Sequence, residues 1–154
     1  MVTGFKKVLW ILTLIAGIIL VLCIVFRSKS MIKMEDHPYI ASIDMTMGQD
    51  GETHEYSLSQ GEISDELNDA LISLVLNAKM RNTLLGPPQI YSVTDDSVWI
   101  SIKISLDTFS IRVNLSTKSE YNYAQCGETN YRIVGYEKLY QNVYDLITDA
   151  YQCR

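Results

Sequence analysis

Residue types that catalyse reactions are scarce in this sequence. It holds two histidines, His37 and His54, and neither lies in a motif with a nucleophile or a second metal ligand. The neighbouring carboxylates Asp95 and Asp96 lack the spacing of a calcium-binding loop and are typical of a solvated turn. Unless folding brings distant carboxylates together, we expect a protein that is not an enzyme and that holds neither a cofactor nor a metal ion.

Two cysteines in the C-terminal half are candidates for a disulfide. Cys126 lies in a predicted turn, and Cys153 follows the last predicted helix. A bridge between them would stabilise the fold by about 3–4 kcal/mol in the chain-entropy model, provided that the compartment is oxidising. The alternative is two unpaired thiols.

Tyrosines are unusually dense near the C-terminus. Four of them recur on one side of the last predicted helix: Tyr136, Tyr140, Tyr144 and Tyr151. Protein interfaces are enriched in tyrosine, so these side chains are a candidate partner surface. Alternatively, the rings pack across the sheet and leave their hydroxyl groups at its rim.

A second apolar row lies on the first predicted helix of the domain, away from the main apolar face. Its members are Ile72, Leu76 and Met80. The row either packs under the loop at 84–88 or binds another chain, since exposed apolar patches commonly mark interaction sites.

Alternating and helical patterns predict the elements that position these residues. Alternation at 41–47, 52–58, 98–106 and 109–115 predicts strands, and shorter strands are expected at 121–124 and 131–134. Ser59 and Glu62 form a capping-box pattern that predicts the start of a helix reaching to about residue 80. A final helix is expected over 136–151.

The expected order is therefore ββαββββα after an N-terminal helix. This order predicts the α+β class, with an antiparallel sheet covered on one face by two helices. We expect a short tail at 1–7, a transmembrane helix at 8–26, a charged stalk at 27–38 and one α+β domain at 39–154.

The composition, 47% hydrophobic over 154 residues, conceals one strongly apolar segment. From Val8 to Phe26 there is no charged residue, and this run spans about 28 Å as a helix, close to the ~30 Å of a hydrocarbon core. It predicts a single transmembrane helix that acts as an uncleaved signal anchor. The alternative is a cleaved signal peptide, whose apolar run is usually about 7–15 residues. Thr13 and Gly17 form a small-xxx-small pair that could pack two such helices together.

The orientation of this segment rests on several weak indications. Lys6 and Lys7 precede it, whereas Arg27, Lys29 and Lys33 follow it, so the positive-inside rule is nearly balanced. The short tail, the acidic domain and its even number of cysteines favour an extracytoplasmic domain. We expect a single-pass protein of the cell membrane. The net charge of −5 disfavours nucleic acid as a partner, because phosphates repel an acidic domain.

The layout resembles that of small single-pass or lipoprotein-like surface proteins of Gram-positive bacteria that carry domains of unknown function. The resemblance rests on the Lys6-Lys7 pair, the segments 40–47, 56–59 and 98–115, and the closing helix at 136–147. It covers most of the chain and implies no catalytic residues.

Together these features predict a membrane-anchored binding domain without catalytic activity. Its expected partner is a protein or an envelope component, for example a toxin that it neutralises as an immunity or inhibitor protein. The alternative is a structural accessory subunit of a larger membrane complex.

Overall fold

The computed structural model describes residues 2–25, 27, 37–49, 52–83, 97–118 and 121–152. Three α-helices, seven strands and one short 3-10 helix, η2, follow one another along this part of the chain. In order they are α1 (Val2–Val25), β1 (Tyr39–Gln49), β2 (Glu52–Ser59), η2 (Gln60–Glu62), α2 (Asp65–Asn77), β3 (Lys79–Asn82), β4 (Val98–Ser105), β5 (Ser110–Ser116), β6 (Tyr123–Cys126), β7 (Thr129–Val134) and α3 (Tyr136–Gln152).

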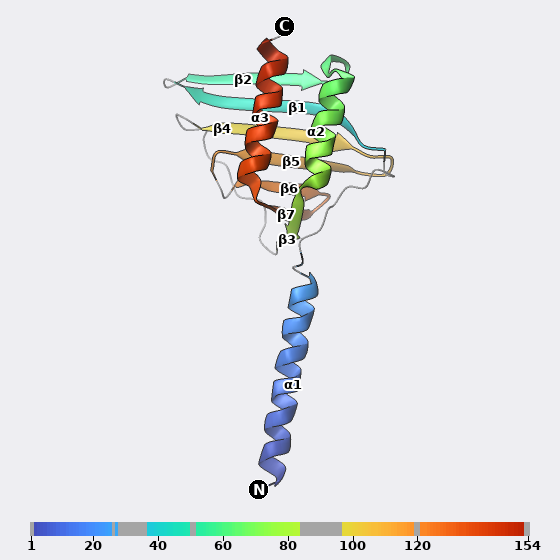
Figure 1. The fold of residues 1–154 in the computed structure, drawn as a ribbon, viewed down its shortest axis with the longest axis vertical. Coiled ribbons are helices and arrows are strands. Elements are labelled where there is room, and N and C mark those ends of the chain that lie inside the picture. Colours follow the sequence, from blue (N-terminus) through green and yellow to red (C-terminus); the bar gives the residue numbers. More distant parts are fainter. Residues whose placement is uncertain are drawn as a thin grey trace.

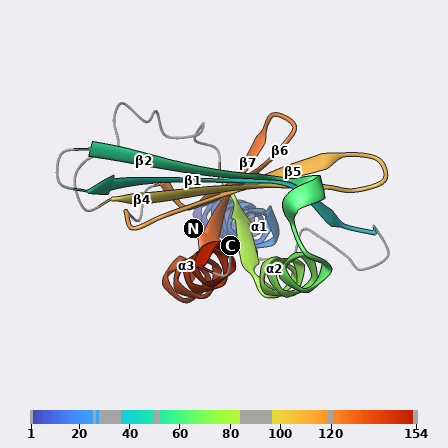
Figure 2. The same cartoon turned by 90° about the horizontal axis from the view of Figure 1, so that it is seen from above.

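The seven strands form one antiparallel sheet in the order β2-β1-β4-β5-β6-β7-β3. β2 and β3 are its two edges, and the chain passes from one edge to the other through η2 and α2. Figure 1 shows α2 and α3 running across the strands rather than along them. Seen from above, both helices lie side by side on the same face of the sheet (Figure 2). This arrangement defines a two-layer α+β domain.

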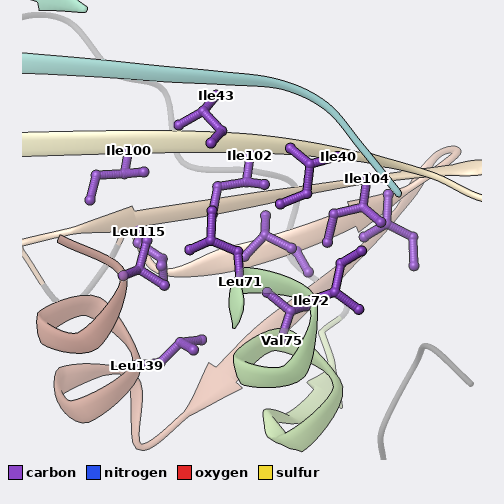
Figure 3. Close-up of a cluster of buried hydrophobic side chains, with 14 of the residues drawn as sticks. Ile40, Ile43, Leu71, Ile72, Val75, Ile100, Ile102, Ile104, Leu115 and Leu139 are labelled. Carbon is purple, nitrogen blue, oxygen red and sulfur yellow. The ribbon is translucent and has the colours of Figure 1, made fainter. Parts of the chain in front are cut away.

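The core lies between the sheet and these two helices (Figure 3). Side chains on a strand alternate between its two faces, and in β4 Ile100, Ile102 and Ile104 all point to the helical side with no exposed surface. Leu71 of α2 and Ile147 of α3 meet them from the other layer and are equally buried. The long strands therefore lie where the alternation predicted them.

The first helix of the domain begins later than the capping box suggested. The carboxylate of Glu62 does accept hydrogen bonds from the backbone N–H and the hydroxyl of Ser59, at 2.9 and 2.8 Å, but this box caps the start of η2. α2 itself is capped by Ser64, whose Oγ accepts a hydrogen bond from the backbone N–H of Leu67 at 3.2 Å. A serine at the N-cap satisfies one of the amides that a helix start leaves without a partner.

The predicted order ββαββββα is wrong because it lacks β3. Residues assigned to the end of the first helix form this edge strand instead, where Met80 lies opposite Ile133 of β7. β3 has four residues and only Met80 is buried, so its sequence shows no alternation. Its conformation comes from pairing with β7, about fifty residues further along the chain.

The prediction of a transmembrane helix between Val8 and Phe26 is also contradicted. In the part of the chain that the structure describes, no helix is both long and apolar enough to cross a membrane. The signal anchor, the single-pass cell-membrane localisation and the extracytoplasmic placement depended on that helix and are contradicted with it.

The predicted boundaries of the N-terminal part differ from the observed ones. Residues 2–7, expected as a tail, belong to α1, which lies outside the two-layer domain in Figure 1. Most of the expected stalk, 28–36, lies outside the described residues.

Candidate functional site

A groove follows the line where α2 and α3 meet on the outside of the helical layer. It consists of two hollows of about 410 and 400 Å³ that share Leu74 of α2 and Asn142 of α3. We call their lining residues the helix groove: Ala70, Ser73, Leu74, Asn77, Ala78, Lys79, Val134, Gly135, Lys138, Leu139, Asn142, Asp145, Leu146 and Asp149.

The two ends of the helix groove carry opposite charges. Lys79 and Lys138 line the hollow near β3, whereas Asp145 and Asp149 line the hollow further along α3. Half-buried Leu74 lies between these ends. The groove therefore offers cations, an apolar contact and carboxylates in succession.

The tyrosine row lies on the other flank of α3. Tyr136, Tyr140, Tyr144 and Tyr151 are all half-buried and pack against the core. The rings of Tyr140 and Tyr144 stack on each other, with centroids 6.0 Å apart and planes at 22°. These contacts favour the interpretation in which the tyrosine rings pack across the sheet. Because the rings are partly exposed, their role as a partner surface stays a prediction.

The Tyr140 hydroxyl lies in an unusual electrostatic environment. Burial, and then the neighbouring charges of Tyr144 and Asp145, raise its pKa to about 12. Each of these causes disfavours the phenolate. Tyr140 therefore remains a neutral hydrogen-bonding group at any physiological pH.

The predicted apolar row does not form one exposed stripe. Ile72 is 7% exposed and Met80 is 1% exposed, and both belong to the core. Met80 lies on β3 rather than on the helix, and half-buried Leu76 packs against the core from α2. The loop at 84–88, expected to cover the row, lies outside the described residues.

The structure places only one of the two cysteines of the candidate disulfide. Cys126 ends β6, is half-buried and forms no disulfide within the described residues. Cys153 lies outside the described residues. The bridge stays a prediction.

Both histidines lie on the surface of the described structure. His54 is exposed on β2 opposite Met47, and His37 is exposed ahead of β1. No group of three or more metal-ligating side chains occurs among the residues that the structure describes.

The sheet face opposite the helices carries a second concentration of polar residues, which we call the polar face. One row of directly paired residues crosses all seven strands there: Ser57, Asp44, Ser101, Asn114, Tyr123, Arg132 and Arg81. A neighbouring row contains Ser42, Lys103, Arg112, Gln125 and Asn130. At the β2 end, Asp44 accepts a hydrogen bond from the Ser57 hydroxyl at 2.8 Å.

Cations that lie far apart in the sequence come together on the polar face. Arg81, Lys103, Arg112 and Arg132 all lie on it and are all exposed, whereas the charged side chains of α2 and α3 are mostly acidic. The net charge hides this division because it sums over both faces. Sequence reasoning missed it, although Lys103, Arg112 and Arg132 occupy outward positions of predicted strands.

The fold and these surfaces define a small α+β domain with a charged groove on one layer and a basic sheet face on the other. No protein-family model, curated protein or solved structure matches the chain. The resemblance in layout to Gram-positive surface proteins therefore stays a prediction, without its membrane-spanning helix.

Proposed function

We propose that this protein is a binding domain without catalytic activity that recognises a segment of another protein in the helix groove. The observation that carries the proposal is the pair of joined hollows with ends of opposite charge. An immunity or inhibitor protein, which acts by occupying its partner, is one form of such a domain.

The charges of the groove specify the chemistry of its occupant. Lys79 and Lys138 favour carboxylates at one end, and Asp145 and Asp149 favour lysine or arginine at the other. Leu74 between them favours an apolar side chain. The occupant is therefore a segment whose acidic, apolar and basic residues follow one another along the groove in either chain direction, because complementary charges fix both partner choice and register.

A peptide selection tests this proposal on the full chain. Random peptides displayed on phage are selected against the immobilised protein, and enriched peptides are synthesised and titrated by fluorescence anisotropy. We expect the acidic–apolar–basic order among them, in either chain direction. Asp149→Lys, which reverses one end of the groove, should weaken binding by about tenfold.

The matched control is Glu137→Lys, because Glu137 is an exposed carboxylate on the same helix that does not line the groove. Peptides that bind the wild type, the Asp149 variant and the control equally would show that the groove is not the site. A selection that enriches no peptide would overturn the proposal as well.

A second candidate function is that of a structural subunit in a larger complex. It is favoured by α1, on which Trp10, Leu14 and Ile18 are 77%, 66% and 53% exposed. Apolar surface of this extent usually contacts another molecule. Gly17 leaves open space around its α-carbon, within a groove of about 500 Å³ along the helix.

Purification from native cells under mild conditions tests this second function. A subunit should co-elute with its complex in a fixed ratio, and Leu14→Glu should release it while leaving its unfolding midpoint unchanged. Elution of the wild-type protein alone would contradict a role as a subunit.

A further inference from the structure

Two pairs of like charges face each other across the strands of the polar face. Lys103 of β4 lies directly opposite Arg112 of β5, and Arg132 of β7 lies directly opposite Arg81 of β3. No carboxylate forms an ion pair with any of these four side chains among the residues that the structure describes. Like charges in directly paired positions destabilise a sheet, so an anionic ligand bound at these positions would be stabilising.

Two buried amides on the same face lack hydrogen-bond partners. Asn114 is 2% exposed and its Nδ2 donor is unpartnered, and Asn130 is 7% exposed and its Oδ1 acceptor is unpartnered. Asn114 is two residues from Arg112 on β5, and Asn130 is two residues from Arg132 on β7. Buried polar atoms without partners are rare and costly. Each cation pair therefore has an unsatisfied amide beside it.

An aromatic side chain lies between the two cation pairs. Tyr123 of β6 is paired with Asn114 on one side and with Arg132 on the other. Its ring is half-buried. Desolvation raises the pKa of its hydroxyl, while the nearby charge of Arg112 acts in the opposite direction. Tyr123 therefore presents a neutral phenol and part of a ring face between two cationic positions.

From these observations we propose that the polar face binds single-stranded nucleic acid. The cations hold phosphates, and Tyr123 stacks on a base. This function goes beyond the protein-binding groove, which lies on the opposite layer.

The extent of the site favours a chain of phosphates over a single anion. From β4 to β3 is four strand steps of about 4.8 Å each, so the cations extend over roughly 19 Å. A small anion reaches one pair, whereas a polyanion reaches both. Stacking on an aromatic ring with cations along the backbone is the common mode of single-strand binding.

The half-buried ring of Tyr123 favours nucleic acid over an acidic polypeptide side chain, because a base can stack on the ring and a carboxylate cannot. The acidic helices lie on the opposite face, so their charges are separated from the ligand by the thickness of the sheet.

Fluorescence anisotropy with the full chain tests the proposal. The probes are fluorescein-labelled 20-nucleotide oligothymidine and oligouridine, and a labelled oligoglutamate of similar charge serves as the comparison. We expect oligonucleotide binding that weakens with salt. Arg112→Ala and Arg132→Ala should each lower the affinity by about tenfold and reduce the slope of log affinity against log salt by about 0.7, the value for one lost phosphate contact.

Two further variants separate the parts of the site. Tyr123→Phe keeps the ring and should retain binding, whereas Tyr123→Ala should lose it. Arg27→Ala removes an exposed arginine outside the sheet and should bind like the wild type. Circular dichroism and urea unfolding verify that each variant is folded.

Three results would overturn the proposal. The first is no oligonucleotide binding at 50 mM salt. The second is binding that Arg112→Ala and Arg132→Ala leave unchanged. In the third, oligoglutamate binds as tightly as the oligonucleotides, and the polar face is then a surface for acidic proteins.

Discussion

The ring of Tyr151 packs edge-on against the ring of Tyr56, with centroids 5.1 Å apart and planes at 68°. Tyr56 lies on β2, the edge strand of the sheet, and Tyr151 lies in the last turn of α3. Both rings are half-buried. This contact fixes the end of the helix to the edge of the sheet, since an edge-to-face arrangement is a favoured geometry for aromatic pairs.

The Tyr56–Tyr151 pair should contribute a measurable coupling energy. In a double-mutant cycle with Tyr56→Ala and Tyr151→Ala, we expect about 0.5–1.5 kcal/mol of coupling from urea unfolding. A cycle between Tyr56 and Tyr136, at the other end of α3, is the control and should be additive. Equal coupling in both cycles would show that the ring contact has no specific effect.

Asn122 should be important for stability through the turn before β6. Its Oδ1 accepts a hydrogen bond from the backbone N–H of Ser116 at 2.9 Å, and its Nδ2 donates to the carbonyls of Ser116 and Lys118 at 3.1 and 2.7 Å. Asn122→Ala leaves these groups without partners and should lower the free energy of unfolding by about 2–4 kcal/mol. Gln125→Ala, which loses one exposed bond to Gly127, should cost less than about 1 kcal/mol. Similar losses for both variants would contradict the prediction.

Tyr140 should make stability fall at alkaline pH. Its pKa is raised to about 12 in the folded protein, whereas an unperturbed tyrosine in the unfolded chain titrates near 10. Between these values the unfolded chain releases a proton that the folded protein keeps, so the free energy of unfolding decreases as pH rises from about 10 to about 12. Below about pH 10 the contribution of Tyr140 to the free energy of unfolding is fully present.

Absorbance at 295 nm, which follows phenolate formation, measures this effect. Tyr140→Phe should remove the tyrosine ionisation that occurs at the highest pH in the folded protein. It should also reduce the decrease in the free energy of unfolding between about pH 10 and 12. Tyr144→Phe should shift the Tyr140 ionisation to lower pH, because it removes one of the charges that oppose ionisation. If the ionisation at the highest pH is unchanged in both variants, it belongs to another residue.

Relieving one like-charge pair on the polar face should stabilise the protein. Lys103→Glu places a carboxylate opposite Arg112 and should raise the free energy of unfolding by about 0.2–1 kcal/mol at low salt. The gain should shrink at high salt because exposed pairs are screened. Ser105→Glu, on the same strand opposite Ser110, is the control and should have no such gain. If Lys103→Glu stabilises the protein but leaves oligonucleotide binding intact, the like-charge pair is unrelated to binding.

The alternating patterns predicted the inward faces of the strands well. Ile100, Ile102 and Ile104 could be assigned to one face because side chains alternate strictly along a strand, and the structure places them in the core. The helix caps were less predictable, since Ser59 and Ser64 are both good capping residues and only the packing of α2 decides between them. β3 could not be predicted, because a short edge strand with one buried side chain is stabilised by its neighbour and not by its own sequence.

The candidate sites likewise differ in how far the sequence predicted them. The sequence identified the tyrosines of α3, since helical spacing alone places Tyr136, Tyr140 and Tyr144 on one flank. The helix groove depends on how α2 and α3 meet, and its charged ends come from residues such as Lys79 and Asp149 that are distant in sequence.

By itself, the sequence determined which side chains of the long strands are buried, because that depends on local periodicity. Strand order, and with it the assembly of Arg81, Lys103, Arg112 and Arg132 on one face, was decided only by the tertiary structure. Pairings such as β3 with β7 join segments about fifty residues apart, and the free energy that selects them comes from burying one common core. The net charge of an acidic chain thus gave no indication of a basic sheet face.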